Sequence, residues 1–158
     1  MSRLGFLRHP QTQLAARNGL GNVLAPKGDP VKAGVQFRLA AGIARDMGDR
    51  RSEGRVQGRL ALSLVRAEAR TEAEERLAAA EALLTSVDDP ASLVELYCRW
   101  AEGALLGRDS ISATKLIERA ERVAACMGSP RAGHLEAMLQ RGRSLTAPPS
   151  LPFGDNDR

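Results

Sequence analysis

The side chains that most often carry out catalysis are few and scattered in this sequence. The two histidines, His9 and His134, lie near opposite ends of the chain, and neither has a candidate nucleophile at a recurrent spacing. The two cysteines, Cys98 and Cys126, form no C-x-x-C pair and have no histidine beside them, so a zinc or redox motif is unsupported. No G-x-G-x-x-G or P-loop pattern occurs. The sequence therefore predicts a protein that is not an enzyme and that binds no metal or cofactor.

Arginine is the side chain with the greatest capacity for binding. The chain has 23 lysines and arginines against 19 acidic residues, which gives a net charge of +4, and its only lysines are Lys27, Lys32 and Lys115. Guanidinium groups suit paired recognition of carboxylates or phosphates. The simplest interpretation is that the arginines solvate helix faces, because a basic balance of this size is compatible with an acidic partner without demonstrating one.

The composition favours closely packed helices in one domain. Hydrophobic residues make up 43% of the 158 residues and aromatic residues only 3%, so alanine and leucine supply most of the apolar surface. No stretch approaches the ~20 apolar residues that span a membrane. Met1–Pro10 contains no apolar run of signal-peptide length. We therefore expect a cytoplasmic protein with no membrane partner.

The elements that must position the arginines belong to a unit that recurs every 40 residues without insertions. Small residues recur in register at Gly21, Ala61 and Ala101, at Ala33, Ala73 and Ala113, and at Ala40, Ala80 and Ala120. Large apolar residues do the same at Leu20, Leu60 and Trp100. A fixed period of this length is typical of stacked-repeat proteins. Residues 10–146 are therefore predicted to form a repeat domain, with units 10–49, 50–89 and 90–129 and a capping helix at 130–146, between a lead at 1–9 and a disordered tail at 147–158.

Each unit is predicted to contain two helices. In the first unit they span Thr12–Ala25 and Val31–Met47. The buried side of the second of these helices is expected to comprise Val35, Phe37, Leu39, Ala40, Ile43, Ala44 and Met47. A final helix at Arg131–Leu145 has polar residues where earlier units are apolar, which suits the outer end of a stack.

Helix starts are marked by short polar side chains. Asp29 is expected to cap the second helix of the first unit, and Asp109 or Ser110 the corresponding helix of the third unit. In the second unit, Thr71 and Glu74 have the spacing of a capping box, so they are expected to begin its second helix.

The residues at the expected helix contacts resemble the tetratricopeptide repeat (TPR), whose pattern is W-x2-L-G-x2-Y, then A-x3-F and a further alanine. The first unit has Arg17-x2-Leu20-Gly21-x2-Leu24, then Ala33-x3-Phe37 and Ala40. The second has Gln57-x2-Leu60-Ala61-x2-Leu64, then Ala73-x3-Leu77 and Ala80. The third has Tyr97-x2-Trp100-Ala101-x2-Ala104, then Ala113-x3-Ile117 and Ala120. These longer units are similar to the extended repeats of bacterial regulators. The resemblance implies an all-α, right-handed α-solenoid of three TPR-like helix pairs plus a C-terminal capping helix.

The resemblance also implies a function, because the first helices of TPR proteins line a concave groove that takes a peptide or partner helix. It implies a non-catalytic scaffold or adaptor that binds another protein. Carried over by position, the groove would present Asn18, Asn22, Arg55, Arg59, Leu62, Arg66, Glu95, Cys98, Arg99 and Glu102. The arginines would pair with an acidic segment, and the two asparagines would hold a peptide backbone. The alternative is an ordinary solvated helix surface.

One variant of the TPR family clamps a C-terminal carboxylate with a set of lysines and asparagines. Asn22 matches that set, but Asn18 and Glu95 stand where lysines are wanted, and Arg59 stands where an asparagine is wanted. Because Glu95 would repel a carboxylate, this mode of binding is disfavoured.

Other functions stay open from the sequence. The chain could be the regulatory or sensing module of a bacterial signalling or transcription system, or it could self-associate through an open end of the stack. Nucleic-acid binding is less favoured, because stacking aromatic residues are scarce and acidic residues are mixed among the arginines.

Overall fold

The computed structural model describes residues 9–128 and 133–147, and those residues form seven α-helices and no strand. The helices are α2 (Pro10–Leu24), α3 (Pro30–Asp46), α4 (Arg50–Arg66), α5 (Arg70–Ser86), α6 (Pro90–Leu106), α7 (Ser110–Ala125) and α8 (Gly133–Thr146). The all-α prediction is therefore confirmed, and the predicted helix limits lie close to the observed ones. Parts of the predicted lead (1–8), of the last turn and capping helix (129–132) and of the tail (148–158) lie outside the described residues.

The six helices from α2 to α7 begin at residues 10, 30, 50, 70, 90 and 110, so the structural period is 20 residues. A residue with positive φ precedes each of the five helix starts from α3 to α7 by two positions, and the same conformation recurs at Gly128. The full set is Gly28, Gly48, Glu68, Asp88, Arg108 and Gly128. After the first five of these residues, the N–H of the next residue bonds to a carbonyl five residues back, as in Asp49 N to Ala44 O at 2.9 Å. This left-handed ending satisfies the last carbonyls of the helix, so one turn geometry links all these helices.

Aspartate caps four of the five described starts from α3 to α7. Oδ1 of Asp29, Asp49, Asp89 and Asp109 accepts the N–H three residues later at 3.0 to 3.1 Å. The exception is α5, where Ala69 occupies the N-cap position and offers no side-chain acceptor. The predicted capping box is therefore wrong: α5 begins at Arg70, so Thr71 already lies inside the first turn.

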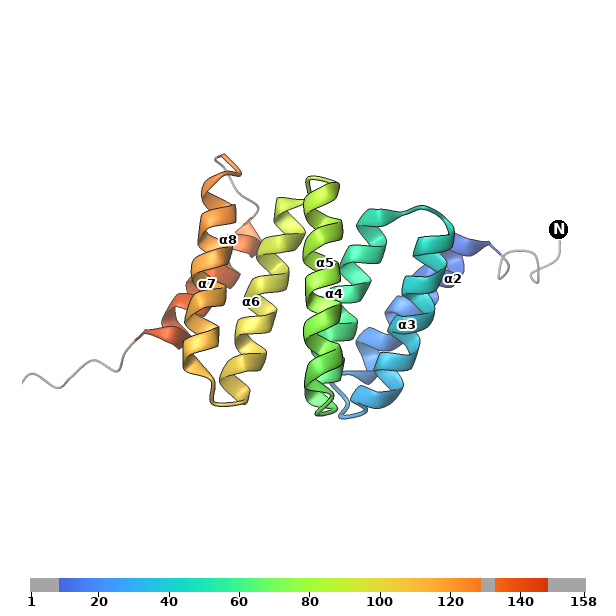
Figure 1. Cartoon of the computed structure of the whole chain (residues 1–158), viewed down its shortest axis with the longest axis horizontal. Helices are drawn as coiled ribbons and strands as arrows, with labels where there is room; N and C mark the ends of the chain where they lie inside the picture. The colour runs from blue at the N-terminus through green and yellow to red at the C-terminus, as the bar shows by residue number, and fades with distance from the viewer. Residues whose placement is uncertain (1–8, 129–132, 148–158) are drawn as a thin grey trace, which may run out of the picture.

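The helices progress along the long axis of the molecule from α2 and α3 at one end to α7 and α8 at the other (Figure 1), where α8 packs on both α6 and α7. The closest packing joins α2 to α3, α3 to α4, α4 to α5 and α6 to α7. Gly21 allows the first contact, since a Cβ there would lie 2.5 Å from the Phe37 ring. Ala61 and Ala101, at the equivalent positions, are almost completely buried. The predicted use of small residues at helix contacts is thus confirmed.

The core consists of two clusters of buried residues. One includes Phe37 and Leu60 from α3 and α4, and the other includes Leu84 from α5 with residues of α6, α7 and α8. Trp100 packs against both clusters. Two residues of the predicted buried side of α3 are wrongly placed: Val35 and Leu39 are 45% and 46% exposed. Both project away from the side of α3 that carries Phe37, because residues two apart in a helix point in nearly opposite directions.

Candidate functional site

Three adjoining hollows form one groove along α2, α4 and α6. Their volumes are ≈ 190, ≈ 370 and ≈ 350 Å³, and Leu62 and Arg99 line all three. The first lies between α4 and α6, the second extends toward Trp100 and Gly107, and the third reaches Asn22 and Pro26 at the C-terminal end of α2. Because the hollows share lining residues, they form a continuous surface, called the groove below.

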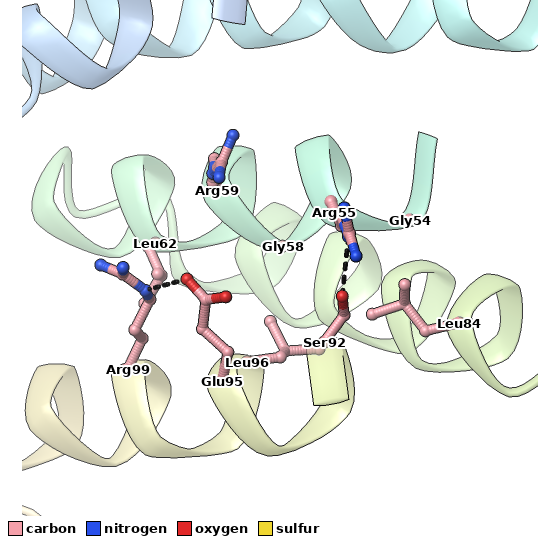
Figure 2. Close-up of a pocket in the computed structure, with 10 residues that line it drawn as sticks. All are labelled: Gly54, Arg55, Gly58, Arg59, Leu62, Leu84, Ser92, Glu95, Leu96 and Arg99. Carbon is pink, nitrogen blue, oxygen red and sulfur yellow. Dashed lines mark hydrogen bonds and ion pairs between the residues drawn. The ribbon is translucent and has the colours of Figure 1, made fainter. Parts of the chain in front are cut away.

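Two glycines one turn apart on α4 shape the first hollow (Figure 2). A Cβ on Gly54 would lie 2.9 Å from Leu84, and a Cβ on Gly58 would lie 2.6 Å from Leu96. The missing side chains therefore let α5 and α6 approach α4 closely. Leu84 and Leu96, together with Leu62, supply apolar surface at this hollow, so its polar side chains lie beside apolar ones.

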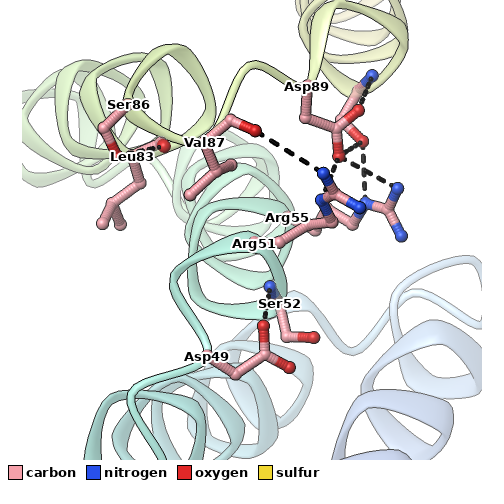
Figure 3. Close-up of polar contacts among 9 residues, drawn as sticks. Asp49, Arg51, Ser52, Arg55, Leu83, Ser86, Val87 and Asp89 are labelled. Atoms are coloured by element: carbon pink, nitrogen blue, oxygen red, sulfur yellow. Dashed lines mark hydrogen bonds and ion pairs between the residues drawn. The ribbon is translucent and has the colours of Figure 1, made fainter.

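Arg55 is held by the N-terminal end of α6. Its Nε donates to Ser92 Oγ at 2.7 Å, and its Nη2 lies 3.0 Å from Asp89 Oδ2. Arg51 approaches the same carboxylate oxygen at 3.4 Å (Figure 3). Burial of Asp89 would raise its pKa, but hydrogen bonds from the Ser92 N–H and hydroxyl and the charges of both arginines hold that pKa below its ordinary value. The charge of Arg55 is therefore largely neutralised within the protein.

Arg59 is the half-buried guanidinium of the groove. Its Nη1 donates to Asn18 Oδ1 at 2.6 Å, and among the described residues no carboxylate forms an ion pair with it. Burial lowers the pKa of Arg59; the positive charges of Arg99 and Arg55 act in the same direction, while the charge of Glu95 opposes them. An arginine stays protonated in spite of such shifts. Arg59 is thus a partly desolvated cation whose hydrogen-bond partner, among the residues that the structure describes, is a neutral amide.

The remaining polar residues of the groove divide into paired and unpaired groups. Arg99 donates to Glu95 Oε1 at 2.8 Å, and Glu102 pairs with Arg141 of α8 at 3.3 Å. Arg66 and Asn22 are exposed and line the third hollow. Within the described part of the chain, Arg66 forms no ion pair. Arg59 and Arg66, seven residues apart on one face of α4, therefore carry the uncompensated charge of the groove.

The structure places the predicted groove residues unequally. Asn22, Arg55, Arg59, Leu62, Arg66, Glu95, Arg99 and Glu102 line the hollows, and Asn18 contacts the groove through Arg59. Cys98 is a correction, because only 2% of it is exposed and it belongs to the core cluster that includes Leu135 and Leu139 of α8. Burial raises the pKa of its thiol to about 11. Cys98 lies 40 residues after Gly58, whose position faces a neighbouring helix.

Sequence reasoning missed the residues that form the floor of the first hollow. These are Gly54, Gly58, Leu84 and Leu96. The available sign was the pair of glycines four residues apart in a helix, since a helical glycine costs stability unless a close contact requires it.

Comparisons with protein-family models, with curated proteins and with solved structures found no match. In the described ranges, no group of three or more histidine, cysteine, aspartate or glutamate residues is arranged to hold a metal ion. Of the described helices, none combines the length and the apolar character needed to cross a bilayer. The groove is therefore the feature on which a functional proposal must rest.

Proposed function

We propose that this chain is a TPR-like repeat protein, an α-solenoid of three helix pairs with α8 as the capping helix, and that it acts without catalysis as a scaffold or adaptor. Its groove binds an acidic peptide segment of a partner protein. The 20-residue spacing of helix starts and the recurrent left-handed turns support the repeat architecture. The contacts of Gly21 with Phe37 and of Gly58 with Leu96 support close packing within and between units.

The observation that carries the binding proposal is the half-buried Arg59 guanidinium without a carboxylate partner among the described residues. A charged donor in a partly desolvated site gains more from an incoming carboxylate than an exposed arginine does. Arg66 lies two turns further along α4 and can contact a second acidic group. Leu62 lies between them on the same helix and offers apolar contact. The groove therefore suits an extended segment in which acidic residues flank an apolar one.

Selection from a random peptide library displayed on phage tests this proposal without a known partner. We expect the wild-type protein to enrich peptides that contain aspartate or glutamate. The Arg59→Gln/Arg66→Gln variant should bind those peptides roughly 10-fold to 100-fold more weakly, the range expected for lost hydrogen bonds to charged groups. Arg50→Gln is the matched control, because Arg50 is exposed on the same helix but does not line the groove.

Fluorescence anisotropy with the selected peptides measures these affinities, and circular dichroism verifies that each variant stays helical. Enrichment of peptides without acidic residues, or equal affinity for wild type and the double variant, would contradict the groove proposal. A labelled single-stranded oligonucleotide is the second probe. Salt-sensitive binding of the oligonucleotide that is stronger than that of any selected peptide would favour nucleic acid as the partner instead.

A further inference from the structure

A row of apolar side chains runs along α3 on the side away from its core residue Phe37. The row consists of Val31, Val35, Leu39 and Ile43 in α3 and of Met47, the C-cap residue that follows the helix, spaced four residues apart. The first three are 65%, 45% and 46% exposed, whereas Ile43 and Met47 are half-buried. Rows with this spacing are the ridges by which helices pack against one another. We call this set the α3 row.

The other two units show that the fold does not require an apolar row at these positions. The residues equivalent to Val31, Val35 and Leu39 are Thr71, Glu75 and Ala79 in α5, and Ile111, Lys115 and Arg119 in α7. At the last two positions of the row, by contrast, all three units keep apolar residues: Ile43 and Met47, Leu83 and Val87, and Val123 and Met127. The second and third positions of the row are thus apolar and exposed in α3 but charged in α7, whereas the first is apolar and exposed in both helices, with Ile111 71% exposed. Something other than the fold of the unit accounts for the α3 row.

Charged residues at the two ends of the row are arranged for an antiparallel pairing. Lys32 lies seven residues before Leu39 and Asp46 lies seven residues after it, so all three fall on nearly one line along the helix. The Lys32 side chain is 74% exposed, and its Nζ forms a surface ion pair with Asp29 Oδ2 of the same chain at 2.8 Å, so a carboxylate of a second copy would be an additional or exchanged partner; Asp46 is exposed as well. When a second α3 runs in the opposite direction and meets the first at Leu39, Lys32 of each copy faces Asp46 of the other. Val35 then faces Ile43.

We propose that two copies of this chain pair through the α3 row, about a two-fold axis near Leu39. Such an interface is isologous, since the same surface serves both copies. Its occupant is another α3, because the apolar row and the opposite charges at its ends complement themselves under the two-fold operation. One helix crossing buries less than the ~1,200 Å² of a standard stable interface. The dimer is therefore weak and depends on protein concentration, and the pairing leaves the groove on α2, α4 and α6 free.

Sedimentation equilibrium of the full chain tests the pairing. The protein concentration should run from roughly 10 μM to 1 mM, a range that suits a weak contact. We expect a monomer–dimer equilibrium for the wild type and at least a tenfold weaker dimer for Leu39→Glu. Ala79→Glu is the matched control, because Ala79 is the equivalent position in α5, and this variant should dimerise as the wild type does. A wild type that stays monomeric throughout, or an equal effect of the two substitutions, would overturn the proposal.

A charge exchange separates pairing through this face from a loss of folding. Lys32→Glu gives up the surface ion pair with Asp29 but places an acid in the first turn of α3, and Asp46→Lys places a base in its last turn, where each new charge favours the helix dipole; circular dichroism verifies that each variant stays helical. Each single variant should therefore fold and should dimerise more weakly, because like charges then meet across the two-fold axis. The double variant restores opposite charges and should dimerise like the wild type. A double variant that dimerises no more tightly than the single variants would refute the antiparallel arrangement.

Discussion

Substituting Ala69 by aspartate should stabilise the protein, because this position lacks the cap that its equivalents have. The backbone of Ala69, at φ −87 and ψ 64, is close to that of Asp49, at φ −82 and ψ 79. An aspartate at 69 can therefore reach the N–H of Glu72 just as Asp49 reaches that of Ser52 at 3.0 Å. A good N-cap is worth about 1 kcal/mol relative to alanine. Glu72 is close enough to repel the new charge, but Arg38 already neutralises it at 2.8 Å.

The expected gain is thus about 1 kcal/mol of unfolding free energy, or roughly 2–4 °C in melting temperature for a chain of this size. Urea denaturation followed by circular dichroism measures it as a higher midpoint with an unchanged m-value. Ala69→Asn should give a similar gain without the charge, Ala69→Leu should give none, and Asp49→Ala should lose a comparable amount. If Asp49→Ala is costly while neither Ala69→Asp nor Ala69→Asn stabilises, the equivalence of the two turns is wrong.

Two further predictions concern glycines and acid. Gly58→Val should destabilise the protein by about 1–3 kcal/mol, because its Cβ would lie 2.6 Å from Leu96. Gly19→Ala should stabilise it by about 0.5–1 kcal/mol, because a Cβ there has nothing within 4 Å. Thermal melts measure both changes, and equal effects on the melting temperature would contradict the packing at Gly58. The pKa of Asp49 is lowered by hydrogen bonds from Ser52 and by the nearby charges of Arg51 and Arg55, so its stabilisation is present above its unfolded pKa of ~3.9 and is lost as pH falls through the lower folded pKa. Asp49→Asn keeps the cap without an acidic group, so its urea midpoint should fall less than that of the wild type between about pH 4 and pH 2; identical slopes would exclude this contribution of Asp49.

The fold was predictable where turn residues mark the helix ends. Gly28-Asp29 and Gly48-Asp49 supply both the left-handed residue and the cap, so the corresponding helix starts follow from the sequence. The turn at Glu68 and Ala69 has the same geometry without either residue type. Its position follows from the regular spacing rather than from local chemistry, and this is why a capping box was wrongly predicted there. Tertiary packing overrides local preference at this turn.

Burial was less predictable because it depends on which neighbour covers each face. Val35 and Leu39 have the apolar character of core residues, yet within the described chain no helix packs over that side of α3. Cys98 has the position of a groove residue by analogy, yet it is buried in the cluster that includes residues of α8. Periodicity specifies which residues share a face, whereas the order of neighbouring units decides which faces remain exposed.

The candidate site shows the same dependence for charge. Arg55 and Arg59 are one turn apart on α4, and the sequence alone does not show which of them is paired with a carboxylate. They differ because Asp89, 34 residues beyond Arg55, forms an ion pair with Arg55 at 3.0 Å, whereas the hydrogen-bond partner of Arg59 in the described part of the chain is the neutral Asn18 amide. Replacing Arg55 would therefore disturb the contact between α4 and α6, and replacing Arg59 would remove an available charge. In the proposed function, binding depends on the few guanidinium groups that carboxylates of the described chain leave uncompensated, and the net charge of +4 does not identify them.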